Sequence, residues 1–263
     1  MPETLTIAVA QPLSVPYDVA ANAVAHARAV RSAAARVVVF PELSLTGYEL
    51  DAGTVAPGDA RLEPLVAACA ETGAVALAGA PVDGDDGPHI AMLAVGGSGV
   101  TVAYRKMYLG AEEALRFAPG ARPRVLEVDG WRLGLAVCKD TGVPEHAAAT
   151  AGLGIDAYVA GTVKHAHEAE LQAERARRIA AGHGVWVAVA SFAGPTGGGF
   201  AETAGRSGVW APGGDPVDQT GPETGALLTT TLTAKPTAQL TAKPATTPAA
   251  KPSSTNPSST TPS

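Results

Sequence analysis

Short apolar runs rich in Val and Ala recur along the 263-residue chain, each bounded by Gly, Pro or Asp. Runs of this length and composition are typical of buried strands. We expect strands at residues 5–10, 36–40, 74–80, 90–95, 100–104, 131–137, 157–160, 185–190 and 207–211. Composition and spacing predict helices at residues 19–35, 60–71, 145–152 and 167–182. This alternation indicates a layered α/β domain, and the hairpin-like stretch at residues 96–99 indicates that its sheet is not wholly parallel.

The charge and the cysteine count exclude several classes of protein. A net charge of −6 does not provide the basic surface that binding to nucleic acid requires. Two cysteines are too few for a disulfide framework or a zinc site, and free thiols fit a reducing compartment, so we expect a cytoplasmic protein. Since no stretch has the apolar length of a membrane span and the first residues lack the pattern of a signal peptide, we expect no membrane association.

The composition changes near residue 234 to Thr, Ser, Pro, Ala and Lys, and Leu240 is the only large aliphatic residue in the last thirty positions. Such a segment cannot bury enough apolar surface to offset the entropy lost on ordering. We therefore predict one folded domain at residues 1–233 and a disordered tail at residues 234–263.

Three polar side chains stand at or just beyond the ends of predicted strands. Glu42 follows Pro41, which cannot continue a central strand; Lys106 ends the strand that starts near residue 100; and Cys138 ends the strand at residues 131–137. Taken singly, each has an ordinary structural interpretation, as a loop glutamate, a solvated lysine and a small buried residue. The other cysteine, Cys69, lies within a predicted helix, and we interpret it as inert packing.

Together, the stretches FPELSLTGY, YRKMYL and GLAVCKD resemble the nitrilase, or carbon-nitrogen hydrolase, superfamily. That family carries a Glu, a Lys and a Cys in this chain order, each at the end of a strand, and they match Glu42, Lys106 and Cys138. Glu113 begins an E-x-x-x-F-x-P-G pattern that resembles the family's second, substrate-positioning glutamate. The resemblance extends over about residues 5–232.

The resemblance implies a fold, an activity and an assembly. The fold is an α/β four-layer α-β-β-α sandwich, and the activity is hydrolysis of a non-peptide carbon–nitrogen bond in a small linear amide. A homodimer or larger homo-oligomer and the absence of any metal or organic cofactor are also implied. Two departures from the family pattern lie near the expected substrate pocket: Lys139 stands where an aromatic residue is usual, and SFAG at residues 191–194 stands where an Asn is frequent.

The three residue types account for a nucleophilic mechanism. A free cysteine thiol, with a pKa of about 8.5, is mostly protonated near neutrality, so it needs a base, which Glu42 supplies. The Lys106 ammonium and the backbone N–H of Lys139 are our candidates for stabilising the oxyanion. By position, Tyr48 and His165 line the pocket.

The spacing of His165 and His167 occurs in metal sites, but no matching carboxylate and histidine cluster accompanies the pair, and we interpret it as a polar loop.

Alternatives of substrate and of class stay open at this stage. N-carbamoyl compounds and nitriles would use the same three residues, and so would acyl transfer from an amide to an amine. A nitrilase-like module that binds a metabolite without turning it over is the rival from a different class. The intact trio argues against that module, because a non-catalytic descendant would be free to lose any member of it.

Overall fold

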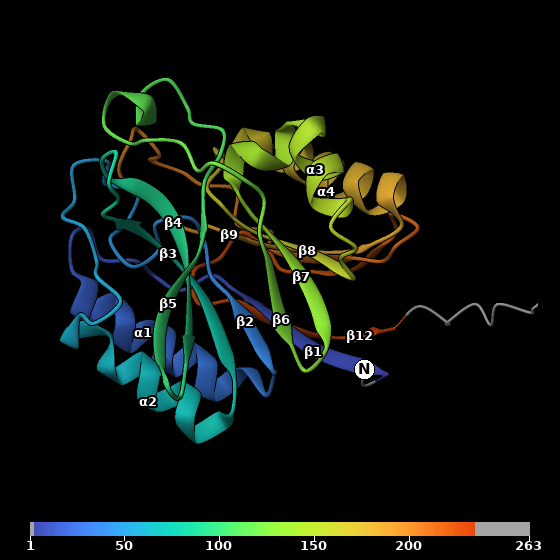
Figure 1. Ribbon diagram of the computed structural model, residues 1–263, viewed down its shortest axis with the longest axis horizontal. Helices are drawn as coiled ribbons and strands as arrows, with labels where there is room; N and C mark the ends of the chain where they lie inside the picture. Colours follow the sequence, from blue (N-terminus) through green and yellow to red (C-terminus); the bar gives the residue numbers. More distant parts are fainter. Residues whose placement is uncertain (1–2, 235–263) are drawn as a thin grey trace, which may run out of the picture.

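The computed structural model describes residues 3–234, which form four layers in the order helix, sheet, sheet, helix (Figure 1). The first sheet contains, in spatial order, β12 (Leu227–Thr233), β1 (Thr4–Ala10), β2 (Val37–Val39), β3 (Val75–Val82), β4 (His89–Gly96) and β5 (Gly99–Arg105). The second contains β11 (Pro216–Gln219), β10 (Gly208–Trp210), β9 (Trp186–Ser191), β8 (Ala157–Thr162), β7 (Trp131–Val137) and β6 (Val125–Val128). The predicted four-layer α/β sandwich is confirmed.

Helices α1 (Val19–Ala33) and α2 (Glu63–Thr72) cover the outer face of the first sheet, and α3 (Pro144–Ala151) and α4 (Ala169–His183) cover that of the second. The helix predicted from residue 60 starts instead as a 3-10 turn, η1 (Ala60–Leu62), because Pro64 favours an α-helical start only from Glu63. Three more 3-10 turns are η2 (Glu113–Leu115), η3 (Cys138–Gly142) and η4 (Ala166–Glu168).

Each sheet has a parallel centre and antiparallel margins. Strand β2 pairs in parallel with β1 and β3, and β8 pairs in parallel with β7 and β9. The hairpin predicted at residues 96–99 joins β4 and β5, with Gly96 opposite Gly99. The carboxyl ends of parallel strands meet at one edge of a sheet, so loops that leave β2 and β7 start from the centres of their sheets, where the surroundings are rigid.

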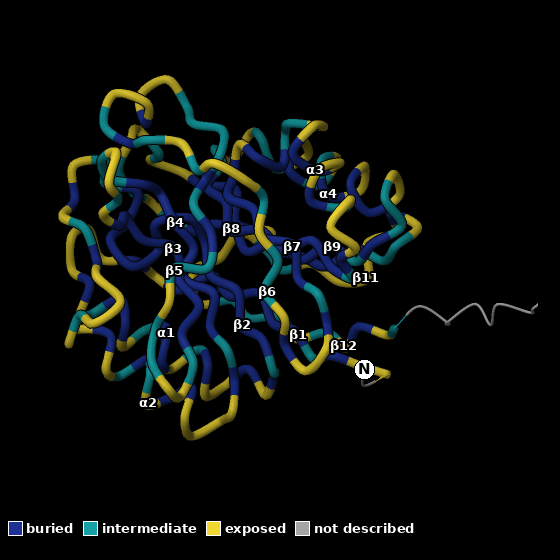
Figure 2. Tube along the Cα trace, in the orientation of Figure 1, coloured by how far each residue is buried: buried dark blue, intermediate teal, exposed yellow. Residues whose placement is uncertain are grey.

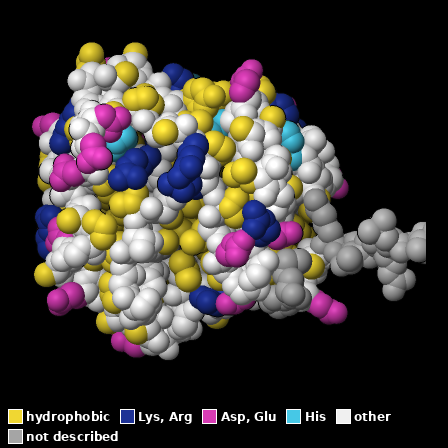
Figure 3. Space-filling model, in the orientation of Figure 1, with side chains coloured by type: hydrophobic (Ala, Val, Ile, Leu, Met, Phe, Trp, Pro, Cys, Tyr) yellow, Lys and Arg dark blue, Asp and Glu magenta, His cyan; other side chains and the backbone are white. Residues whose placement is uncertain are grey.

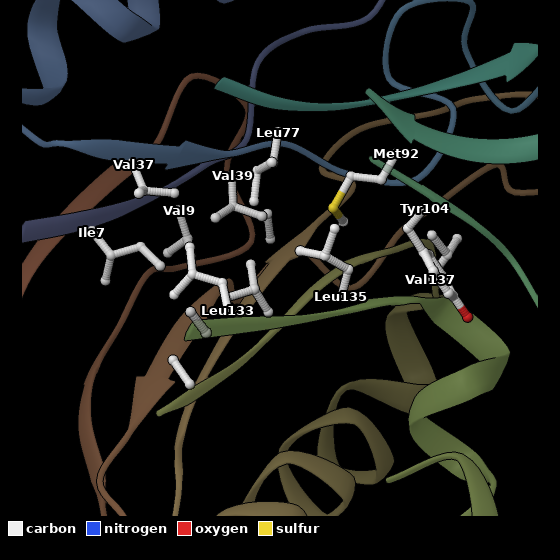
Figure 4. Packing of buried hydrophobic residues seen from close by; sticks show 14 of the residues in the cluster. Ile7, Val9, Val37, Val39, Leu77, Met92, Tyr104, Leu133, Leu135 and Val137 are labelled. Atoms are coloured by element: carbon white, nitrogen blue, oxygen red, sulfur yellow. The ribbon is translucent and has the colours of Figure 1, made fainter. Parts of the chain in front are cut away.

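The strands present alternate side chains to two different cores. In β1, Ile7 and Val9 face the other sheet, whereas Ala8 and Ala10 face the helices. Figure 4 shows side chains of the two sheets pointing at one another across the central layer, and Figure 2 shows the central strands of both sheets buried. Because both faces of the central strands are covered, their sequences are apolar throughout rather than alternating.

The sequence did not predict the strands β6, β11 and β12. Strand β12, LLTTTLT, is rich in Thr and mostly half-buried or exposed, yet it pairs with β1 along its whole length, from Thr4 opposite Thr233 to Ala10 opposite Leu227. Its β-branched residues suit an edge strand, but without apolar alternation they give no strand signal.

The predicted tail lies outside the described residues except for Ala234. Among residues 3–234, no helix has the length and apolar character needed to cross a membrane.

Candidate active site

The three candidate catalytic residues come from both sheets. Glu42 follows β2 after Phe40 and Pro41, and Lys106 directly follows β5, so both belong to the first sheet. Cys138 directly follows β7 in the second sheet. All three are buried, with 1%, 1% and 7% of their surface exposed. All three groups are therefore shielded from bulk water.

The Lys106 ammonium joins two carboxylates. Its Nζ donates to Glu42 Oε1 and to Glu113 Oε1, at 2.6 Å each. Glu113 also accepts a hydrogen bond from the Tyr48 hydroxyl at 2.5 Å and one from the Gly110 backbone N–H at 2.6 Å. The second oxygen of Glu42, Oε2, is buried and has no hydrogen-bond partner among the described residues. Glu42 thus keeps one oxygen free to accept a proton, whereas Glu113 is occupied on both.

Burial and charge act differently on the two carboxyl groups. Burial raises the pKa of Glu42 to about 7, although Lys106 acts in the opposite direction. Burial also acts to raise the pKa of Glu113, but Lys106, Tyr48 and Gly110 together lower it below its usual value. Burial alone would lower the pKa of Lys106; the two carboxylates raise it instead, so the lysine keeps its charge. Near neutrality, Glu42 is the group of this cluster that can exchange a proton.

The candidate nucleophile, Cys138, lies on a strained backbone. Cys138 has φ = +43°, a left-handed conformation that costs a non-glycine residue free energy and is found at functional sites. Its Sγ donates to the Val163 carbonyl oxygen at 3.2 Å, and its own carbonyl accepts from Thr141 Oγ1 at 2.7 Å. Burial and the charge of Glu42 raise the pKa of the thiol to about 12, while Lys106 and Lys164 act to lower it. Near neutrality the sulfur is therefore a thiol, and it would act as a nucleophile only if a base removed its proton.

Two glycines allow the segment that carries Glu42 to pass between the sheets. A Cβ atom added to Gly79 in β3 would overlap the backbone of Pro41 and Leu43. A Cβ atom added to Gly161 in β8 would lie 2.6 Å from the Phe40 carbonyl oxygen. The loop after β2 therefore packs tightly against one strand from each sheet, which fixes the position of the Glu42 backbone.

An aromatic wall runs outward from the carboxylates. The ring of Tyr48 meets that of Phe200 edge-on at a centroid distance of 5.2 Å, and Phe200 stacks on His165 at 4.2 Å. His165 in turn stacks on His167, and both line a surface cavity of about 380 Å³ with Gly199 and Glu202. The structure thus connects Tyr48 and His165 through Phe200.

Lys139 stands where the family usually has an aromatic residue, but it does not occupy a buried position. Its side chain is exposed, and its Nζ donates to the Leu109 carbonyl oxygen at 2.5 Å. This hydrogen bond connects Lys139, the residue after Cys138, to the loop between Lys106 and Glu113.

A larger depression, of about 690 Å³, lies elsewhere and is lined by none of the predicted site residues. Its lining includes Asp85, Asp86, Arg105, Arg122 and Arg124. On the face in Figure 3, basic and acidic side chains are interspersed rather than gathered in patches of one sign. Within residues 3–234, no group of three or more His, Cys, Asp or Glu side chains is placed to hold a metal ion.

Sequence reasoning missed several residues that support the site. Asp140, two positions after Cys138, is fully buried and hydrogen-bonded to two of the three strands that carry catalytic candidates, β5 and β7. Its place directly after Cys138 and Lys139 was a signal, since a carboxylate beside an apolar strand end needs partners. Phe200 and Gly79 carry no such signal, because only the fold brings them to the site.

The chain resembles characterised proteins in sequence and in fold. A family model described as carbon-nitrogen hydrolase matches residues 6–241. No curated protein sequence matches the chain.

Solved structures match it over most of its length. A mutant of the amidase from Nesterenkonia sp. AN1 in complex with butyramide is 27% identical, with a TM-score of 0.79, and the match covers 87% of this chain and 91% of that one. Another mutant of that amidase, with the acetamide moiety of fluoroacetamide added covalently at the active site cysteine, is 26% identical, with a TM-score of 0.76 and coverage of 87% and 90%. A Saccharomyces cerevisiae member of branch 10 of the nitrilase superfamily is 21% identical, with a TM-score of 0.78 and coverage of 89% and 91%, and shares the fold.

Proposed function

The chain belongs to the carbon-nitrogen hydrolase family and is a hydrolase of carbon–nitrogen bonds, and from this premise we propose that it is an amidase acting on small linear amides. The observation that carries the proposal is the buried cluster in which Lys106 Nζ lies 2.6 Å from Glu42 while both charges act on the Cys138 thiol. The similarity to an amidase solved with butyramide supports an amide rather than a nitrile as substrate.

In the first half of the reaction, Cys138 Sγ attacks the carbonyl carbon of the amide and its proton passes to Glu42 Oε2, which has no other partner among the described residues. The carbonyl oxygen becomes an oxyanion, which the Lys106 ammonium and the Lys139 backbone N–H stabilise. The intermediate collapses, Glu42 returns the proton to the leaving nitrogen, and ammonia or an amine departs. An acyl thioester remains on Cys138.

In the second half, a water molecule attacks the thioester carbon through its oxygen, and Glu42 takes a proton from that water. The bond between carbon and sulfur breaks, the carboxylic acid leaves, and the thiol regains a proton from Glu42.

The remaining residues have supporting roles. Glu113 holds Lys106 in place through its 2.6 Å ion pair, Tyr48 orients Glu113, and His165 lines the neighbouring surface cavity and stacks on Phe200, which contacts Tyr48.

The proposal predicts ammonia release from simple aliphatic amides. Incubation with a panel of linear amides, N-carbamoyl compounds and nitriles, followed by an ammonia assay, identifies the substrate class. We expect turnover of the amides, and we expect Cys138→Ala to reduce it by at least about 10³-fold because the nucleophile is lost. Cys69→Ala is the matched control and should retain activity, since Cys69 is buried in α2, away from the trio.

Three outcomes would contradict this assignment. Full hydrolytic activity in a folded Cys138→Ala protein would remove the nucleophile from the mechanism. Tight binding of amides without release of ammonia by the wild-type protein would favour a binding module. Transfer of the acyl group to an added amine, detected by mass spectrometry, would indicate an acyltransferase instead.

A further inference from the structure

A buried chain of polar side chains lies beneath the candidate active site and has no part in the steps above. It consists of Asp140, Tyr104, His146 and Tyr158, which are 0–1% exposed and come from η3, β5, α3 and β8. The Tyr104 hydroxyl donates to Asp140 Oδ2 at 2.7 Å and lies 2.9 Å from His146 Nε2. His146 Nδ1 lies 2.9 Å from the Tyr158 hydroxyl.

The hydrogen bonds of this chain run in one direction. Tyr104 has a single hydroxyl proton, which it donates in a hydrogen bond to Asp140, so its oxygen accepts a hydrogen bond from the N–H of His146 Nε2. Burial lowers the pKa of His146, so the ring is neutral, and Nδ1 then accepts a hydrogen bond from the Tyr158 hydroxyl. Tyr158 thereby fixes the His146 tautomer that carries its proton on Nε2. Because that N–H donates to the Tyr104 oxygen, the Tyr104 hydroxyl proton is directed toward Asp140.

The carboxylate of Asp140 accepts hydrogen bonds from residues next to two of the catalytic candidates, Cys138 and Lys106. It accepts from the backbone N–H of Val137, one residue before Cys138, and Asp140 itself lies two residues after Cys138. It also accepts from the Tyr104 hydroxyl and from the backbone N–H of Tyr108, which lie two residues before and two residues after Lys106. Figure 4 shows Tyr104 reaching from its strand to the end of β7 beside Val137.

From these hydrogen bonds we propose that Asp140, fixed by Tyr104, His146 and Tyr158, is a positioning residue. It sets the spacing between the Cys138 sulfur and the Lys106 ammonium. The two groups lie in different sheets, and no strand pairing connects β5 with β7. Asp140 connects their ends directly, at 2.9 Å to each backbone, and supports the left-handed conformation of Cys138. The inference rests on the proposed function, because it assigns a purpose to the spacing of the same site.

Tyr104→Phe tests this, because it removes only the hydroxyl, which joins His146 to Asp140 and also accepts from the backbone N–H of Met107, next to Lys106, at 3.3 Å. We expect kcat for amide hydrolysis to fall about 10- to 100-fold with KM unchanged within about twofold, since misplacement of reacting groups acts on the chemical step. Asp140→Asn should cost more, because an amide nitrogen would face backbone donors. Tyr108→Phe is the matched control: its hydroxyl has no partner among the described residues, and kcat should stay within about twofold.

A second measurement does not depend on the substrate. The rate at which chloroacetamide alkylates Cys138, followed by peptide mass spectrometry, should fall in Tyr104→Phe but not in Tyr108→Phe. If the wild-type protein hydrolyses no amide, the proposed function fails while the alkylation rates still test the positioning role. A folded Tyr104→Phe protein with wild-type kcat and alkylation rate would overturn the inference. Equal losses in Tyr104→Phe and Tyr108→Phe, or a loss confined to KM, would overturn it as well.

Discussion

Glu42, Glu113 and Lys106 place two carboxylates and one ammonium in a region where water cannot screen them. If all three are ionised, the cluster carries one negative charge, and burial of an uncompensated charge is costly. Glu113 accepts three hydrogen bonds and stays ionised, so the excess proton belongs to Glu42, whose pKa burial raises to about 7. A base with a pKa near the working pH is well suited to accept and return a proton.

This charge balance predicts the pH dependence of turnover. Glu42 accepts the thiol proton only when it is ionised, so kcat should rise with pH through about 7 and level off above it. Steady-state kinetics on one amide from about pH 5 to about pH 9 would measure this limb. A kcat that stays flat across that range would contradict the assignment of Glu42 as the base.

Glu42→Gln tests the same carboxyl group by substitution. Glutamine keeps the shape of the side chain and can still accept a hydrogen bond from Lys106, but it cannot take a proton. We expect kcat to fall by at least about 10²-fold while the thermal unfolding temperature changes little. Activity close to that of the wild type would mean that another group accepts the thiol proton.

The elements around the Glu42 loop approach one another closely at two glycines. Glycines in β3 and β8 allow the backbone after β2 to pass between them, so the loop with Glu42 is enclosed by the first sheet on one side and the second on the other. Cys138 directly follows the last residue of β7, and Lys106 directly follows the last residue of β5. No linker therefore separates either residue from its strand. This short attachment keeps the reacting groups at fixed separations.

Gly79→Ala should disturb that enclosure. The added methyl group would meet the backbone of Pro41 and Leu43, which cannot move aside as a flexible side chain would. We expect a loss of about 1–3 kcal/mol in the free energy of unfolding, measured with urea, together with reduced kcat. Gly53→Ala is the control, because an added methyl group there contacts nothing within 4 Å and the variant should match the wild type.

At the scale of the molecule, the sandwich leaves α3 and α4 as an outer layer with apolar side chains facing solvent. Leu171 in α4 and Leu153 just after α3 are each 41% exposed. The family resemblance implies a homodimer through outer helices, and exposed leucines on this layer fit such an interface.

We therefore predict that the protein sediments as a dimer or a larger oligomer. Leu171→Asp would place a charge in the interface and should shift the population toward monomer, by at least tenfold in the dissociation constant. Val217→Asp, at a 48% exposed position in β11 outside the helical layer, is the matched control. A wild-type protein that is monomeric at all concentrations tested would contradict this prediction.

The local pattern of the chain was enough to locate most of the elements and to single out the candidate site residues. Buried central strands such as β2 and β7 are apolar throughout, and Glu42 and Cys138 stand out because polar or reactive residues interrupt those runs. Strand β12 escaped prediction because its threonines obtain their place from pairing with β1, which is distant in sequence.

What the sequence by itself determined is where most of the buried strands and the helices lie, because an apolar run bounded by Gly, Pro or Asp is a local pattern in residue type. Only the tertiary structure decided that Glu42 and Lys106, 64 residues apart, form an ion pair beside a thiol from the other sheet. It also decided that Glu42 titrates near neutrality and that Asp140 joins the two strand ends. Those properties depend on distances and burial created by the packing of one sheet on the other, and residue order alone does not encode them as a local pattern.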